Sequence, residues 1–198
     1  MKYLGDAVIL CGGKSERMNF DKAFLKIDGK YMIDIIYERL SLCFENVKLC
    51  ANSKERFNAT FDIEVVEDKI EGRFGPAVGI YSALSQATTK YVFVIACDMP
   101  LINPDHIEFM KRTLEDNDFL PDALVPMNGG YIEPLYSFYS TEISEKFEDE
   151  IKHGNYKIYS ILDKVNTLYM DEKYSKMFDE GLSMFTNVNY PADLERFL

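Results

Sequence analysis

Four short apolar runs constrain the fold of this chain more than any other feature of its sequence. The runs are Ala7–Cys11, Val47–Ala51, Ile63–Val66 and Tyr91–Cys97, and they are read as continuous and not alternating, although Lys48 and Glu64 each interrupt one of them. A strand that is apolar throughout needs cover on both faces, which is typical of a parallel sheet packed between two layers of helices. The runs therefore predict buried strands of one open sheet.

Segments of helical length separate these runs. Met32–Cys43 carries apolar residues at helical spacing, Pro76–Ala87 opens with a proline suited to a first helical turn, and a third amphipathic segment follows Pro104. This alternation predicts an α/β fold, with an open, mostly parallel sheet, flanking helices and right-handed crossovers. Ala23–Ile27 is expected to be a short extended piece before the first helix.

The pattern changes after about Asn117. Asn128-Gly129-Gly130-Tyr131 separates the apolar runs Ala123–Met127 and Ile132–Tyr139, which predicts a hairpin that adds antiparallel strands to the parallel half. Further along the chain we expect helices over Glu142–Ile151 and Tyr156–Val165, a strand over Thr167–Met170 and a closing helix over Pro191–Phe197. Because the sequence has no internal repeat and no clear linker, residues 1–198 are predicted to form a single domain.

The net charge of the chain limits the classes of partner that it is expected to bind. The 198 residues carry a net charge of −11, and the pI is near 4.7. Such a surface repels nucleic-acid phosphates and anionic membranes, so we expect neither as a partner. The stretch from Lys14 to Lys30 differs, because it holds five cations against three acids. A small anionic ligand is therefore compatible with this composition.

The four cysteines, Cys11, Cys43, Cys50 and Cys97, form no C-x-x-C pair. This spacing argues against a zinc site or a disulfide framework, and favours free thiols in a reducing compartment. The sequence also shows no signal-peptide pattern and no apolar stretch near the roughly 18 residues of a membrane span. We therefore expect a cytoplasmic protein.

The loop after the first apolar run, Cys11-Gly12-Gly13-Lys14, looks like the end of a Walker phosphate loop. It is not one, because Val8 stands where that motif requires its first glycine. Two residues without a Cβ still let the backbone approach a ligand closely, and Arg17 and Lys22 supply positive charge. Seen alone, the segment is nearly as typical of a glycine turn with solvated cations.

Polar residues also follow the other buried runs. Asp98 follows Tyr91–Cys97, Asn52 follows Val47–Ala51, and Asp68 lies just beyond Ile63–Val66. The carboxyl ends of parallel strands share the sheet edge at which α/β proteins bind ligands. A carboxylate at this edge suits Mg²⁺ with substrate phosphates, and carboxylates and amides bind bases and ribose. Each residue alone is as typical of a turn, but together they favour a nucleotide site.

Four segments carry a resemblance to a known family, the molybdenum cofactor guanylyltransferases. They are "LCGGKSERMNFDKAFL" at Leu10–Leu25, "GRFGPAVGI" at Gly72–Ile80, "ACDMPLI" at Ala96–Ile102 and "TNVNYPADL" at Thr186–Leu194. The segments occur in the family's order and extend over nearly the whole chain. The first one alone is also similar, in looser form, to cytidylyl- and sugar nucleotidylyltransferases.

The resemblance implies a Rossmann-like, GT-A-like nucleotidyltransferase fold and a reaction. GMP would pass from GTP to molybdenum-molybdopterin with Mg²⁺, forming the guanine dinucleotide cofactor and pyrophosphate. Carried over position by position, it implies a GTP site of Leu10, Cys11, Gly12, Gly13, Lys22, Asn52, Asp68 and Asp98. Arg17, Lys22 and Asp98 would act in catalysis, and Asp98 would hold the metal. GTP, molybdopterin and, transiently, a molybdopterin-delivering protein would be the partners.

Three positions depart from the family pattern. Asn19 replaces a glycine, Cys11 replaces an alanine, and "IEPLYSFYS" at Ile132–Ser140 lacks the H-P-T form of some members. The last departure lies where the acceptor is expected, so the acceptor is the less constrained part of the assignment. A cytidylyltransferase, another nucleoside triphosphate:phosphate nucleotidylyltransferase, and a non-catalytic nucleotide-binding protein stay open as alternatives.

The remaining chemistry-bearing residues have simpler expected roles. His106 and His153 are expected at surface or capping positions. Asn187 and Asn189 are expected either to face the metal or to close a turn before Pro191. The late aromatic residues are expected to be mostly core, with a stacking wall for a flat pterin as the alternative; they are Tyr131, Tyr136, Phe138, Tyr139, Tyr156 and Tyr159.

Overall fold

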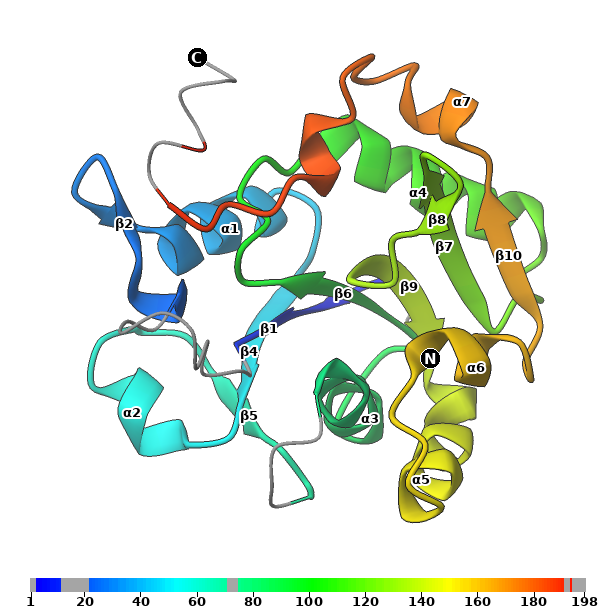
Figure 1. Ribbon diagram of the computed structural model, residues 1–198, viewed down its shortest axis with the longest axis horizontal. Helices are drawn as coiled ribbons and strands as arrows, with labels where there is room; N and C mark the ends of the chain where they lie inside the picture. The colour runs from blue at the N-terminus through cyan, green and yellow to red at the C-terminus, as the bar shows by residue number, and fades with distance from the viewer. Residues whose placement is uncertain (1–2, 12–21, 71–74, 191–192, 194–198) are drawn as a thin grey trace.

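A mixed, mostly parallel sheet forms the centre of the molecule (Figure 1). The computed structural model describes residues 3–11, 22–70, 75–190 and 193. Over these residues the sheet has eight strands: β1 (Asp6–Leu10), β4 (Asn46–Ala51), β5 (Val65–Glu67), β6 (Tyr91–Ala96), β7 (Ala123–Asn128), β8 (Tyr131–Ile132), β9 (Tyr136–Ser140) and β10 (Thr167–Met170). The strand order is β10-β7-β9-β6-β1-β4-β5, with β8 paired to β7. The predicted α/β fold is confirmed.

Helices cover both faces of this sheet. They are α1 (Met32–Leu40), α2 (Lys54–Asn58), α3 (Pro76–Ser85), α4 (Pro104–Asp116), α5 (Ser144–Lys152), α6 (Ile158–Leu162) and α7 (Glu172–Ser175). Along β1, Ala7 and Ile9 pack with α1 and α4, whereas Val8 and Leu10 pack with α3, α5 and α6. Figure 1 shows these two groups of helices on opposite sides of the sheet. Every residue of β1 is buried, and for Ala7–Leu10 the apolar sequence predicts this.

The antiparallel part differs from the sequence-based expectation in one place. The predicted strand Ile132–Tyr139 is two strands, because the chain leaves the short β8 at Glu133 and re-enters the sheet as β9. Pro134 lies in this break, and because proline has no backbone N–H, it cannot donate a hydrogen bond to a neighbouring strand. β9 then runs antiparallel between β6 and β7, and β10 adds in parallel to β7.

Short elements complete the chain. They are the 3₁₀ turns η1 (Lys22–Phe24), η2 (Thr141–Ile143) and η3 (Ser183–Phe185), and a two-stranded ribbon of β2 (Lys26–Ile27) and β3 (Lys30–Tyr31). The expectation of an extended Ala23–Ile27 is therefore wrong for its first half, which is turn. The predicted closing helix Pro191–Phe197 lies outside the described residues except at position 193. Within the described residues, no helix is long and apolar enough to cross a membrane.

A buried carboxylate joins the amino-terminal ends of three neighbouring strands. Asp6, at the start of β1, is only 3 % exposed and accepts a hydrogen bond from Asn46 at the start of β4 (2.8 Å). It also accepts from the backbone N–H groups of Thr88 (2.6 Å) and Thr89 (3.0 Å), which precede β6. Burial raises the pKa of Asp6, but the hydrogen bonds outweigh burial and hold the pKa below its usual value.

Removing this carboxylate is expected to destabilise the whole fold. Asp6→Ala leaves the N–H groups of Thr88 and of the buried Thr89 without their acceptor, and we expect a loss of about 3 kcal/mol in the free energy of unfolding. Urea denaturation measures this loss. The matched control is Asp62→Ala at an exposed position, which should change little. Equal effects of the two substitutions would show that the Asp6 network does not hold the strands together.

His106 is not the surface or capping residue that the sequence suggests. Its side chain is fully buried in α4, beside the rings of Tyr136, Phe178 and Phe185, and Asn103 is the residue that caps the helix. Its Nε2 lies 3.0 Å from Ser175 Oγ, and its Nδ1 has no hydrogen-bond partner within the described part of the chain. Burial lowers the pKa of His106 from 6.5 to about 4. The imidazole is therefore neutral in the folded protein. His153, by contrast, is exposed at the end of α5, as expected.

A buried neutral histidine makes stability depend on pH in a defined window. Its contribution is complete above pH 6.5 and is lost as the pH falls towards 4, because the unfolded chain binds the proton more tightly. Between pH 7 and pH 5 this costs about 2 kcal/mol. His106→Gln, which does not titrate, should lose correspondingly less stability over this interval in urea denaturation. The same loss in both proteins would contradict the assignment.

Candidate active site

Four parallel strands end side by side and bring predicted site residues to one edge of the sheet. Leu10 ends β1, and its register partners are Cys50 on β4 and Ala96 on β6. Backbone hydrogen bonds continue past the strand ends, from Cys11 N to Cys50 O (2.8 Å) and from Cys97 N to Leu10 O (3.1 Å). The residues just beyond these ends are therefore held in line with one another.

Asn52 and Asp68 occupy the β4–β5 side of this edge. Asn52 directly follows β4 and is exposed, while the backbone N–H of Asp68 donates to the carbonyl of Ala51 (3.1 Å). Burial raises the pKa of Asp68, although hydrogen bonds from Cys50 and Ser82 oppose this. The Cys50 thiol lies 3.4 Å from Asp68 Oδ1. A half-buried carboxylate and an exposed amide on adjacent strand ends form a suitable surface for a nucleoside.

Asp98 lies at the end of β6, two residues beyond its last strand position. The backbone N–H of Val188 donates to the carbonyl of Asp98 at 2.7 Å, which brings the closing segment of the chain to this edge. Val188 is fully buried, and Asn187 and Asn189 flank it. The segment that carries these asparagines therefore lies beside Asp98, while their expected role, facing the metal or closing a turn, stays a prediction.

A helix approaches this edge closely because it contains glycine. A Cβ on Gly79 in α3 would lie 3.1 Å from Leu10 Cδ2, so a larger residue here would displace the Leu10 side chain at the end of β1 by a few tenths of an ångström. Gly75, which precedes Pro76 and α3, has a φ of 81°, a value that favours glycine. These contacts give the segment Gly75–Ile80 a physical role.

The remaining predicted residues cannot be placed. Gly12, Gly13 and Arg17 lie outside the described residues, as does the side chain of Lys22. The loop that would surround a triphosphate therefore stays a prediction. Within the part of the chain that the structure describes, no three His, Cys, Asp or Glu side chains gather to hold a metal ion.

Two thiols at this edge, those of Cys11 and Cys50, are buried. Cys11, Cys43, Cys50 and Cys97 are all free. Burial raises the pKa of both Cys11 and Cys50 far above its ordinary value, so neither forms a thiolate near neutral pH. The expectation of free, non-nucleophilic cysteines at this site is consistent with these environments.

Residues 7–168 match the family model of the MobA-like NTP transferase domain. The chain belongs to this family. It is 36 % identical, over 99 % of its length and 89 % of the other protein, to a probable molybdenum cofactor guanylyltransferase of Peptoclostridium acidaminophilum. A molybdenum cofactor guanylyltransferase of Syntrophotalea carbinolica is also 36 % identical, over all of this chain and 91 % of that protein.

Solved structures agree with this assignment. The chain is similar to molybdopterin-guanine dinucleotide biosynthesis protein A of Archaeoglobus fulgidus, with a TM-score of 0.83 and 28 % identity. The similarity covers 96 % of this chain and 95 % of that protein. The resemblance and the fold expected from the sequence motifs are therefore both confirmed.

The close packing of Gly79 on Leu10 leads to a testable coupling. Gly79→Ala pushes Leu10 towards the expected nucleotide, so we expect the Kd for GTP to rise about fivefold, or about 1 kcal/mol. In a Leu10→Ala background, where the opposing methyl groups are absent, the same change should have little further effect. Isothermal titration calorimetry measures both. An equal loss in the two backgrounds would show that the contact does not transmit the effect.

Proposed function

We propose that this protein transfers GMP from GTP to molybdenum-molybdopterin, releasing pyrophosphate. The observation that carries the proposal is full-length similarity to a protein named as a molybdenum cofactor guanylyltransferase, combined with a matching site. In that site, polar residues from the ends of β4, β5 and β6 share the edge at which α/β proteins bind ligands. We further propose that the chain acts as a single domain in the cytoplasm, and that a molybdopterin-delivering protein contacts it transiently.

The reaction needs alignment and charge stabilisation more than proton transfer. The attacking group is a phosphate oxygen of the acceptor, which is already ionised. It forms a bond to the α-phosphorus of GTP while the bond from that phosphorus to the bridging oxygen of pyrophosphate breaks. The protein therefore has to align two anions that repel each other and to stabilise the leaving pyrophosphate. Arg17, Lys22 and the backbone N–H groups of Gly12 and Gly13 would supply this positive charge.

Asp98 is the residue that suits a magnesium ion. Mg²⁺ binds to proteins through one or two carboxylates and completes its shell with water and substrate phosphates. One half-buried carboxylate at the end of β6 fits this pattern. When bound, the ion would neutralise charge on the triphosphate. Asn52 and Asp68 would bind the nucleoside at the neighbouring strand ends.

A pyrophosphate-release assay tests the proposed function and its alternatives together. We expect release with GTP and molybdopterin, and much less with CTP or without the acceptor. Faster release with CTP would show a cytidylyltransferase. Nucleotide binding by calorimetry without any release would show a binding protein that does not catalyse transfer.

Two substitutions test the catalytic roles. Lys22→Ala and Asp98→Ala should each lower kcat/KM by about 10²- to 10³-fold, or about 3–4 kcal/mol of transition-state stabilisation. Circular dichroism should show an unchanged fold. Lys54→Ala and Asp62→Ala serve as matched controls, since both side chains are exposed. Unchanged turnover in Asp98→Ala would rule out its role with the metal.

A further inference from the structure

The ends of β1, β4, β5 and β6 form the edge proposed to bind the nucleotide (the nucleotide edge), and a hollow lies further along the sheet, at the ends of β7 and β10. This tyrosine pocket has a volume of about 640 Å³, and its lining residues are Met127, Gly130, Tyr131, Ile132, Tyr159, Asp163, Tyr169, Asp171 and Glu172. Its three tyrosines are exposed to solvent: Tyr131 is 79 %, Tyr159 is 60 % and Tyr169 is 39 % exposed. A pocket of this size can hold a small organic ligand, and three exposed aromatic rings favour a planar ligand on which they can stack.

The tyrosine pocket and the nucleotide edge lie on the same side of the sheet. On β7, Val125 packs in the core with α3, α5 and α6, and Met127, two residues on, shares its face. Tyr169 of β10 pairs in register with Val125 and lies on that face too. Leu10, at the nucleotide edge, belongs to the same core cluster.

The two sites are also at the same end of the sheet and close to each other. β7 and β10 run parallel to β6, because β9 is antiparallel to both β6 and β7. Their carboxyl ends therefore share the edge with Asp98. Only β9 lies between β6 and β7, which places the two strand ends about 10 Å apart. A ligand with a phosphate at one end and a ring system at the other can reach both.

One carboxylate of the tyrosine pocket is available to a ligand. Glu172 accepts from Gly129 N (2.7 Å) and pairs with Lys176, and Asp171 caps α7 through Lys173 N (2.9 Å). Asp163 makes no side-chain hydrogen bond or ion pair with any residue that the structure describes, and it is exposed. A free carboxylate beside aromatic rings accepts hydrogen bonds from a nitrogen heterocycle that carries N–H groups.

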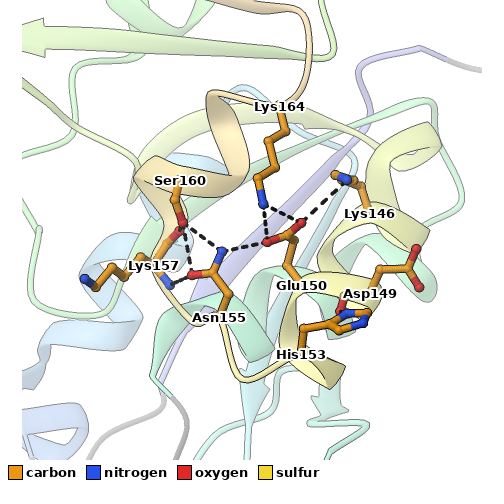
Figure 2. Close-up of polar contacts among 8 residues, drawn as sticks. All are labelled: Lys146, Asp149, Glu150, His153, Asn155, Lys157, Ser160 and Lys164. Carbon is orange, nitrogen blue, oxygen red and sulfur yellow. Dashed lines mark hydrogen bonds and ion pairs between the residues drawn. The ribbon is translucent and has the colours of Figure 1, made fainter.

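The helix that carries Tyr159 and Asp163 is held firmly in place. Figure 2 shows Glu150 of α5 bound by Lys164, at 2.8 Å and 2.7 Å, and by Asn155, at 2.7 Å. Asn155 also bonds to Ser160 of α6. These bonds tie the residues on both sides of α6 to α5, and Lys146, one turn earlier in α5, pairs with the same Glu150. The pocket wall is thus built before any ligand arrives.

From these observations we infer that the tyrosine pocket binds the pterin rings of the acceptor. The tyrosines stack on the flat rings, Asp163 accepts from the N–H edge, and the acceptor's phosphate reaches the nucleotide edge at Asp98. Anionic parts of the acceptor stay outside, because the pocket lining contains three acids and no base. The inference rests on the proposed function for the identity of the acceptor.

Pterin fluorescence tests this inference without the reaction. Neopterin phosphate is titrated into the wild-type protein, and we expect saturable quenching. Tyr159→Leu and Asp163→Asn should each raise its Kd about tenfold, consistent with the loss of a stacking or hydrogen-bonding partner, with the Kd for GTP unchanged. Leu120→Ser and Asp62→Asn, at exposed positions elsewhere, are the matched controls. Absence of binding by the wild-type protein, or equal Kd values in all variants, would overturn the inference.

A transfer assay separates failure of the inference from failure of the proposed function. In Tyr159→Leu and Asp163→Asn, the KM for molybdopterin should rise while the KM for GTP does not. Transfer of GMP by the wild-type protein, with an unchanged KM for molybdopterin in both variants, would contradict the pocket assignment alone. Binding of neopterin phosphate that depends on Tyr159, without any GMP transfer, would support the pocket and contradict the proposed function.

Discussion

The registration of β1 between β4 and β6 is the constraint on which the rest of this structure depends. Asp6 fixes it at one end of the sheet, where a single buried carboxylate accepts hydrogen bonds from residues next to both neighbouring strands. Because parallel strands pair residue by residue, alignment at the start of β1 is carried to its end at Leu10. A shift of one residue would turn every side chain of β1 to the other face. The alignment of the strand ends at the nucleotide edge therefore depends on the Asp6 hydrogen bonds at the opposite end of the sheet.

The order of the strands extends this edge into a long surface. β6 contributes Asp98, and β7 and β10, parallel to it beyond β9, contribute the tyrosine pocket. An enzyme that joins two anionic substrates needs two such neighbouring sites, one for each substrate, with the reacting phosphates meeting between them. The chain turns back after β7 as β8, which lies beside the pocket, and the break at Glu133–Leu135 then separates β8 from β9.

The sequence predicts the parallel half well, and the reason is physical. Runs such as Tyr91–Cys97 are apolar on both faces and have few alternatives to a buried strand, so their positions and the polar residues after them follow directly. Local sequence patterns predict structure less well where contacts between distant segments determine strand pairing and burial. Ile132–Tyr139 looks like one strand, yet both of its parts pair with β7 and only the second part also pairs with β6. His106 looks like a polar residue near a helix start, but rings from distant segments surround it.

The aromatic residues show the same limit. Tyr136, Phe138 and Tyr139 are buried, as expected for core, whereas Tyr131 and Tyr159 are open to the pocket. No periodicity separates the two groups, because the fold decides which rings it covers.

The central claim is that the ends of β1, β4, β5 and β6 bind one nucleotide. A crystal structure with GTP and Mg²⁺ tests it most directly. We predict the triphosphate beside Asp98 and the nucleoside beside Asn52 and Asp68; a nucleotide bound away from this edge would contradict the account.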